Sequence, residues 1–149
     1  MIIKKVPLFD VYQTARQMRR LMCEYFADLG PWLDVPFVQF YKHVCLLPYV
    51  EDPATVETVS RPAFTLDPNY CPRDCDDKAV LLGSWFKAHG EPLRVVASST
   101  RRNGSLHHTF IQLGNGLFID GTYPEYSNLL GYYPYFPHIT KLQALTNFF

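Results

Sequence analysis

The strongest structural signal in the sequence is a helix over residues 76–89, directly after Cys75. Apolar residues fill the interior of this segment, acidic residues open it, and basic residues and a glycine close it. Asp74 is suited to the N-cap position, and Asp77 three residues later completes a capping-box pair. Gly83 costs about 1 kcal/mol relative to alanine, which the other signals outweigh. The pattern therefore predicts a capped helix that begins at the cysteine.

Three short segments after this helix have the composition of β-strands. Turn-forming residues separate them, including a Gly114-Asn115-Gly116 hairpin loop. The predicted strands cover residues 93–99, 107–113 and 117–122. Because a helix followed by an antiparallel sheet is typical of one fold class, the sequence predicts an α+β domain.

The segments before Cys75 give weaker signals. Apolar residues three or four apart over residues 9–29 predict an amphipathic helix that ends at Gly30-Pro31. Residues 32–50 are apolar and aromatic, but their prolines leave a short helix and strands equally open. Residues 51–73 are polar and interrupted by prolines, which favours an ordered loop with short extended pieces.

Residues 124–149 are rich in tyrosine, phenylalanine and proline and contain no repeat. We expect a short helix over residues 140–147. The segment as a whole is expected to cover the sheet or to bind a protein partner.

Composition excludes several classes of function. The 14 Lys and Arg residues balance 14 Asp and Glu residues, which argues against a nucleic-acid partner. The sequence contains no apolar run of about 18 residues and no signal-peptide pattern at its start. We therefore expect one soluble, cytoplasmic domain over residues 1–149, without a membrane partner. Four cysteines are too few for a disulfide scaffold, and Cys23 and Cys45 are expected to be buried thiols.

Cys75 is the cysteine whose position indicates reactivity. The N-terminus of a helix lowers the pKa of a thiol, because backbone N–H groups and the helix dipole stabilise the thiolate. Asp74, Asp76 and Asp77 oppose this effect, since their charge should raise the same pKa. Activation of Cys75 would therefore need a nearby imidazolium. The alternative is an ordinary buried or disulfide-bonded cysteine.

His107 and His108 begin the second predicted strand, and side-chain alternation sends them to opposite faces of the sheet. The register of the following hairpin decides which of them shares a face with Asp120. A three-residue loop at positions 114–116 places Phe110 opposite Asp120 and puts His108 on the Asp120 face. A two-residue turn would select His107 instead. We favour His108, so Cys75 would be the nucleophile, His108 the base and Asp120 the carboxylate that orients the imidazole.

Three blocks of this sequence resemble the transglutaminase-like superfamily, especially its short bacterial and phage members. They are Asp74-Cys75-Asp76-Asp77, His108-Thr109-Phe110-Ile111 and Phe118-Ile119-Asp120-Gly121-Thr122, within a resemblance that spans about residues 50–123. The resemblance implies a papain-like core, in which the nucleophile helix packs on an antiparallel sheet. Arg73 departs from the glycine that is common at this position in the family. By analogy with papain-like relatives, the Asn69 amide is a candidate oxyanion donor, although its alternative is a turn residue.

The resemblance implies thiol-dependent acyl transfer, as in a cysteine peptidase or amidase that hydrolyses a peptide or protein substrate without a cofactor. Two alternatives are a glutamine-lysine cross-linking enzyme and a structural or assembly module, such as a virion component of a phage. A zinc site at Cys71, Cys75 and the His107-His108 pair has suitable ligands, but it lacks paired cysteine spacing. We therefore predict no metal.

Overall fold

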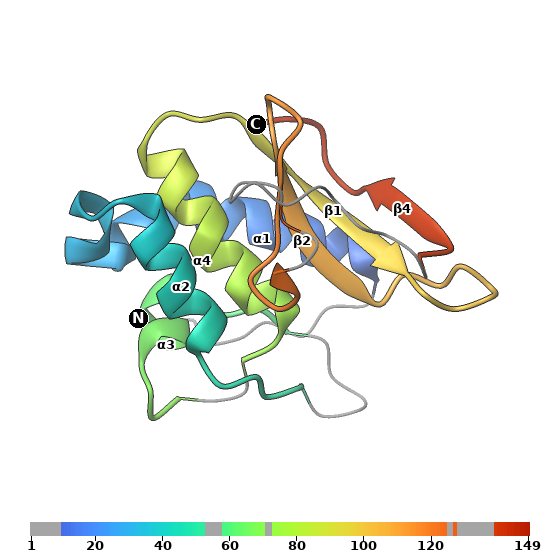
Figure 1. Ribbon diagram of the computed structural model, residues 1–149, viewed down its shortest axis with the longest axis horizontal. Helices are drawn as coiled ribbons and strands as arrows, with labels where there is room; N and C mark the ends of the chain where they lie inside the picture. The colour runs from blue at the N-terminus through green and yellow to red at the C-terminus, as the bar shows by residue number, and fades with distance from the viewer. Residues whose placement is uncertain (1–9, 53–57, 71–72, 125–126, 128–138) are drawn as a thin grey trace.

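The computed structural model describes residues 10–52, 58–70, 73–124, 127 and 139–149 (Figure 1). Its described part is α+β, with four α-helices packed on a four-stranded antiparallel sheet of order β3-β2-β1-β4. The chain runs through the helices before it enters the sheet. This order agrees with the predicted fold class. Within the described residues, no helix is long and apolar enough to cross a membrane.

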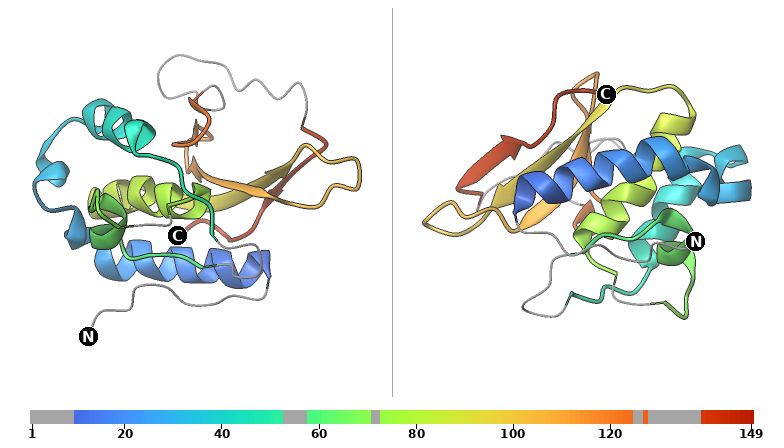
Figure 2. Two further views of the ribbon diagram at one scale, coloured as in Figure 1. Left: turned by 90° about the horizontal axis from the view of Figure 1, so that it is seen from below. Right: turned by 180° about the vertical axis from the view of Figure 1, so that it is seen from behind.

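Helix α4 (Cys75–Ala88) is the central element and has the predicted start and capping box. The Asp74 side chain accepts hydrogen bonds from the backbone N–H groups of Asp76 and Asp77, and the Asp77 carboxylate accepts one from the Asp74 N–H. The helix is buried along most of its length, and it packs beside helix α1 (Val11–Tyr25) (Figure 2) and contacts the sheet. Gly83 lies where a Cβ atom would collide with Met22 of α1. A larger residue there would force the flexible end of the Met22 side chain to move, so glycine suits the close packing of the two helices.

Helix α1 (Val11–Tyr25) begins at Asp10, whose carboxylate accepts the backbone N–H of Gln13 at 2.8 Å. The predicted α-helix to residue 29 is wrong in its last turn, because the chain continues from Phe26 to Asp34 as the 3₁₀ segment η1. Gly30 inside this segment has a φ of 55°, which interrupts regular helix geometry.

Residues 32–50, for which the sequence left a helix and strands equally open, contain helix α2 (Phe37–Leu46). Residues 51–73, which were expected to form a loop with extended pieces, contain the short helix α3 (Pro62–Leu66), and Pro62 occupies its first turn. Proline is favourable there, because that backbone position needs no hydrogen-bond donor. Residues 53–57 and 71–72 of the same segment lie outside the described residues.

The sheet begins with β1 (Leu93–Ser99), as predicted, and continues with β2 (His108–Leu113), one residue later than predicted. Strand β3 (Phe118–Ile119) is shorter than the expected residues 117–122. All three pair antiparallel, with β2 in the middle. All three predicted strands are therefore present, and they differ from the prediction only in where they begin or end.

The predicted helix at residues 140–147 is wrong. Strand β4 (Lys141–Ala144) occupies this segment and pairs antiparallel with β1, from Val96 opposite Ala144 to Ser99 opposite Lys141. Because the open edge of β1 offers unpaired backbone groups, sheet hydrogen bonds outweigh the weak helical pattern of this segment. Residues 125–126 and 128–138 of the aromatic C-terminal segment lie outside the described residues, so its predicted partner contact is untested.

Candidate active site

The hairpin between β2 and β3 has the register that selects His108. Ile111 lies opposite Ile119, and Gln112 lies opposite Phe118. The Leu113 N–H donates to the Leu117 carbonyl at 2.8 Å, so residues 114–116 form a three-residue loop. The predicted register is confirmed. It brings His108 and Asp120 to the same face of the sheet.

His108 and Asp120 are in direct contact. Nε2 of His108 lies 2.5 Å from Oδ2 of Asp120, and both side chains are buried. The imidazole contacts two aromatic rings: it stacks on Phe110 with ring centroids 5.4 Å apart, and it meets Tyr123 edge-to-face at 4.8 Å. A carboxylate on Nε2 fixes the ring orientation and favours the tautomer in which that nitrogen carries hydrogen. Nδ1 is then the nitrogen that can accept a proton.

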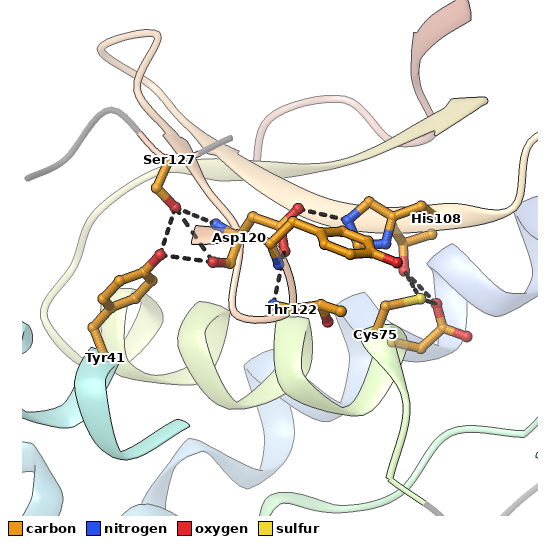
Figure 3. A network of polar contacts seen from close by, with 9 residues as sticks. Tyr41, Cys75, His108, Asp120, Thr122 and Ser127 are labelled. Atoms are coloured by element: carbon orange, nitrogen blue, oxygen red, sulfur yellow. Dashed lines mark hydrogen bonds and ion pairs between the residues drawn. The ribbon is translucent and has the colours of Figure 1, made fainter. Parts of the chain in front are cut away.

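Asp120 is held by hydrogen bonds on both its carboxylate and its backbone. Oδ1 accepts the backbone N–H groups of Thr122 and Tyr123, each at 2.8 Å. The Asp120 N–H donates to the Ser127 hydroxyl at 2.7 Å, and the Tyr41 hydroxyl donates to the Asp120 carbonyl at 2.7 Å. Figure 3 shows Tyr41 and Ser127 together behind Asp120, on the side away from His108. The carboxylate therefore reaches His108 from a fixed position.

Cys75 occupies the first position of α4, and only 9% of its surface is exposed. The Thr109 hydroxyl lies 3.6 Å from Sγ of Cys75, and Oδ1 of Asp76 lies 3.8 Å from the same sulfur. Thr109 also donates a hydrogen bond to Asp76. A neutral thiol can donate to the Asp76 carboxylate in this arrangement, whereas a thiolate would face its charge.

The environment of Cys75 opposes ionisation. Burial raises the pKa of the thiol well above its usual value, and the charges of Asp76 and Asp74 raise it further, while hydrogen bonds from Thr109 act in the opposite direction. Burial and the neighbouring carboxyl groups also raise the pKa of Asp74. The helix terminus alone therefore does not activate this thiol, as the acidic sequence around it predicted.

Consecutive residues of β2 make the contacts to the two ends of the site. Thr109 contacts the thiol from one face of the strand, while His108 beside it contacts Asp120. In the view of Figure 3, the His108 ring lies between Asp120 and the sulfur of Cys75. The structure therefore pairs the predicted base with its predicted orienting carboxylate, and it connects Cys75 to β2 through Thr109.

Arg73, the residue that departs from the family pattern, is fully buried just before α4. Its guanidinium donates to the backbone carbonyls of Thr65 and Asp67, each at 2.8 Å, and of Pro48 at 3.2 Å. Its backbone also pairs with Val50 through hydrogen bonds of 2.6 and 2.7 Å. Arg73 therefore connects residues 48–50 and residues 65–67 to the start of helix α4.

The other residues singled out from the sequence lie elsewhere. His107 accepts the Thr100 N–H on Nε2 at 2.9 Å, away from Asp120. Asn69 is exposed, and its N–H donates to Asp67 at 2.9 Å in a turn. No described contact joins the Asn69 amide to Cys75, so its oxyanion role stays a prediction. Cys23 is exposed, which corrects its expected burial, and Cys45 is half-buried.

The zinc alternative is not favoured by this arrangement. His107 accepts a hydrogen bond from Thr100 whereas His108 contacts Asp120, and Cys71 lies outside the described residues. Among the residues that the structure describes, no three His, Cys, Asp or Glu side chains are grouped as metal ligands would be.

Several residues of the site gave no signal in the sequence. Tyr41 and Ser127 reach Asp120 only through the tertiary fold, from 79 and 7 residues away. Thr109 is marked only by its position next to His108, and its contact with Cys75 was not predicted. Comparison of the chain with protein-family models, curated proteins and solved structures gave no match. Function must therefore be inferred from the geometry of these side chains.

Proposed function

We propose that the protein is an enzyme of thiol-dependent acyl transfer, which hydrolyses a peptide or amide bond through Cys75, His108 and Asp120. The observation that carries this proposal is the buried 2.5 Å contact between His108 and Asp120, beside a helix that begins with Cys75. A nucleophile, a base and a group that orients the base are the minimum set for this chemistry. The transglutaminase-like motifs and the α+β fold agree with the same proposal.

The Cys75 sulfur attacks the acyl carbon as its proton passes to Nδ1 of His108, and the electron pair of the carbonyl moves to oxygen. His108 returns the proton to the leaving amine as the carbon–nitrogen bond breaks, which leaves a thioester on Cys75. Asp120 stabilises the imidazolium that exists between the two transfers.

Water completes the cycle. The oxygen of water attacks the thioester carbon as His108 accepts a proton from that water. When the carbon–sulfur bond breaks, His108 passes the proton to the sulfur and the thiol is restored. The start of α4 supplies backbone dipole near the developing oxyanion. An amine in place of water would give transamidation, so hydrolysis and cross-linking differ only in the acceptor.

The dependence of Cys75 on His108 gives a direct test. Iodoacetamide alkylation of each cysteine is followed by mass spectrometry in the native protein and in the His108→Ala and His107→Ala variants. We expect alkylation of Cys75 to slow at least about tenfold in His108→Ala only. Cys23, which is exposed, serves as an internal reference in every sample. Equal Cys75 rates in all three proteins would contradict an activated thiol.

A second candidate is a structural or assembly module that keeps this fold without turnover. The raised pKa and near-complete burial of Cys75 favour it, because both disfavour a nucleophile. The two candidates differ in one measurement, which is the cleavage of a peptide library or the incorporation of a primary amine into it. Turnover that disappears in Cys75→Ala supports the enzyme, and its absence supports the module.

A further inference from the structure

The start of helix α4 uses two of its backbone donors for its own cap. A thiolate at a helix N-terminus is normally stabilised by the N–H groups of the first turn. Here the Asp76 N–H donates to Oδ1 of Asp74 at 3.1 Å, and the Asp77 N–H donates to the same oxygen at 3.3 Å. The capping box therefore occupies two N–H groups that would otherwise be available to a charged sulfur on Cys75.

Thr109 of β2 is a side-chain donor that reaches the sulfur from outside this helix. Its hydroxyl oxygen lies 3.6 Å from Sγ of Cys75, and the hydroxyl also donates a hydrogen bond to Oδ1 of Asp76. Thr109 is 8% exposed, and its backbone is fixed by antiparallel pairing opposite Ala97 of β1. The strand therefore holds one hydroxyl group against two acceptors.

The Thr109 hydroxyl has a single hydrogen, so it donates to one acceptor at a time. The neutral thiol of Cys75 is itself a donor to Oδ1 of Asp76, at 3.8 Å. Loss of the thiol proton turns the sulfur into a charged acceptor, and hydrogen bonds to charged acceptors are the stronger ones. Rotation about the C–O bond of Thr109 is then enough to move its hydrogen from Asp76 to the sulfur.

The electrostatic surroundings of the sulfur agree with this geometry. Burial raises the pKa of Cys75, the charges of Asp76 and Asp74 raise it further, and hydrogen bonds from Thr109 lower it. A donor lowers the pKa of a thiol because it stabilises the charged form. Thr109 therefore acts on the thiol in the direction that catalysis needs, whereas the two acids act against it.

We propose that Thr109 is a positioning residue whose hydroxyl moves its hydrogen bond from Asp76 to the Cys75 sulfur as the thiol loses its proton. This inference rests on the proposed function, because it assigns a role at the same nucleophile. No covalent bond of Thr109 forms or breaks, and the thiol proton still passes to His108. Thr109 stabilises the sulfur, whereas Cys75 and His108 carry the chemistry.

Two substitutions separate the hydroxyl of Thr109 from its shape. Thr109→Val keeps the shape but removes the hydroxyl, and Thr109→Ser keeps the hydroxyl but removes the methyl group. Iodoacetamide alkylation of Cys75 at pH 7 is followed by peptide mass spectrometry, with the exposed Cys23 as internal reference. We expect the rate to fall about tenfold in Thr109→Val and to stay within about twofold of the native rate in Thr109→Ser. A role in packing alone predicts the reverse order.

Thr14→Val is the matched control. Thr14 is also a buried threonine, and its hydroxyl donates to the Asp10 carbonyl at 3.1 Å on α1. Its Cys75 rate should equal that of the native protein, and circular dichroism verifies that each variant is folded. Equal rates in the native and Thr109→Val proteins would overturn the inference, and so would an equal fall in Thr109→Val and Thr109→Ser.

A second pair of variants tests whether Thr109 acts on the sulfur directly. In Thr109→Val the buried Asp76 carboxylate loses a donor, which can itself destabilise the protein. Asp76→Ala removes that carboxylate and, unlike asparagine, brings no amide that could donate to the sulfur. We expect the double variant Asp76→Ala, Thr109→Val to be alkylated about tenfold more slowly than Asp76→Ala alone. Equal rates would overturn the inference, because Thr109 would then act only through Asp76.

The outcomes separate this inference from the proposed function, which is tested with His108→Ala. A Cys75 rate that depends on His108 but does not change in Thr109→Val would overturn the role of Thr109 and leave the enzyme proposal standing. A rate that falls in Thr109→Val but not in His108→Ala would contradict the proposed function, while the hydrogen bond from Thr109 to the sulfur would be supported.

Discussion

Asp120 and Cys75 lie at the two ends of the candidate site and are held in different ways. Asp120 receives backbone hydrogen bonds on its carboxylate, and two hydroxyl groups fix its backbone. Cys75 is surrounded by carboxyl groups that raise its pKa. One end is therefore built to hold a negative charge, and the other end resists one. Ionisation of the thiol, rather than orientation of the base, should limit activity at this site.

This difference has a consequence for the mechanism that we propose. A preformed pair of thiolate and imidazolium would need a Cys75 pKa well below its usual value, whereas the surroundings raise it. Proton transfer to His108 should therefore accompany attack on the acyl carbon, as in hydroxyl-based hydrolases. The rate of alkylation should rise as the pH increases through the alkaline range, since the thiolate fraction grows there.

The largest effect should come from substitution of His108, the proposed proton acceptor. We expect His108→Ala to lower turnover by roughly 10³-fold or more, because it removes the proton acceptor. His107→Ala is the neighbouring control and should have little effect, since His107 accepts a hydrogen bond from Thr100 instead. Turnover of a cleaved library peptide measures both. If the two variants lose turnover equally, the assignment of His108 as the base is wrong.

The next largest effect should come from the Asp120 end. Asp120→Asn keeps the size of the side chain but replaces the acceptor that faces Nε2, so the imidazole loses its orienting charge. We expect a loss of turnover of roughly 10²- to 10⁴-fold with a smaller change in KM. Steady-state kinetics at several pH values measure this, with circular dichroism to verify folding. Unchanged kcat in a folded variant would show that the contact is structural.

Substitution of Asp76 beside Cys75 should raise the reactivity of the site, whereas the two substitutions above lower it. Asp76 is the largest charge contribution to the raised pKa of Cys75. Asp76→Asn removes this charge, so the pKa should fall and the thiolate fraction at neutral pH should rise. We expect alkylation of Cys75 at neutral pH to accelerate about tenfold.

The pH dependence of alkylation by iodoacetamide measures this shift. Asp34→Asn, which changes an exposed acid at the end of η1, should leave the profile unchanged. A profile that does not move in Asp76→Asn would mean that burial alone sets the pKa, and the contrast between the two ends would then disappear.

The central helix and the His108–Asp120 pair were predictable, because both depend on local rules. A capping box needs residues three apart, and the hairpin register depends on the length of one loop. The structure has both features as expected. The local sequence therefore determines the strand register that places His108 on the same face as Asp120.

Features that depend on tertiary neighbours were not predictable. Residues 141–144 have a weak helical pattern, yet they pair with β1 because its edge was open. Tyr41 belongs to a segment that the sequence left undecided, and nothing local indicates that its hydroxyl meets Asp120. Cys23 also has apolar neighbours in sequence, but it lies on the outer side of α1.

Tyr41 provides the smallest and most specific test. Its hydroxyl donates to the Asp120 carbonyl at 2.7 Å and contacts the Ser127 hydroxyl at 2.8 Å, all in a buried region. Tyr41→Phe leaves that carbonyl with the Ser127 hydroxyl at 3.3 Å. We expect a loss of about 1–2 kcal/mol in the free energy of unfolding, because a buried acceptor loses its closest donor.

Urea denaturation measures the stability of Tyr41→Phe, with Tyr12→Phe as the control at an exposed tyrosine. Turnover should fall only severalfold, since Thr122 and Tyr123 still hold the Asp120 carboxylate. A loss of turnover as large as that of Asp120→Asn in a folded Tyr41→Phe protein would contradict this. It would mean that the backbone contacts, and not the carboxylate contacts, keep Asp120 against His108.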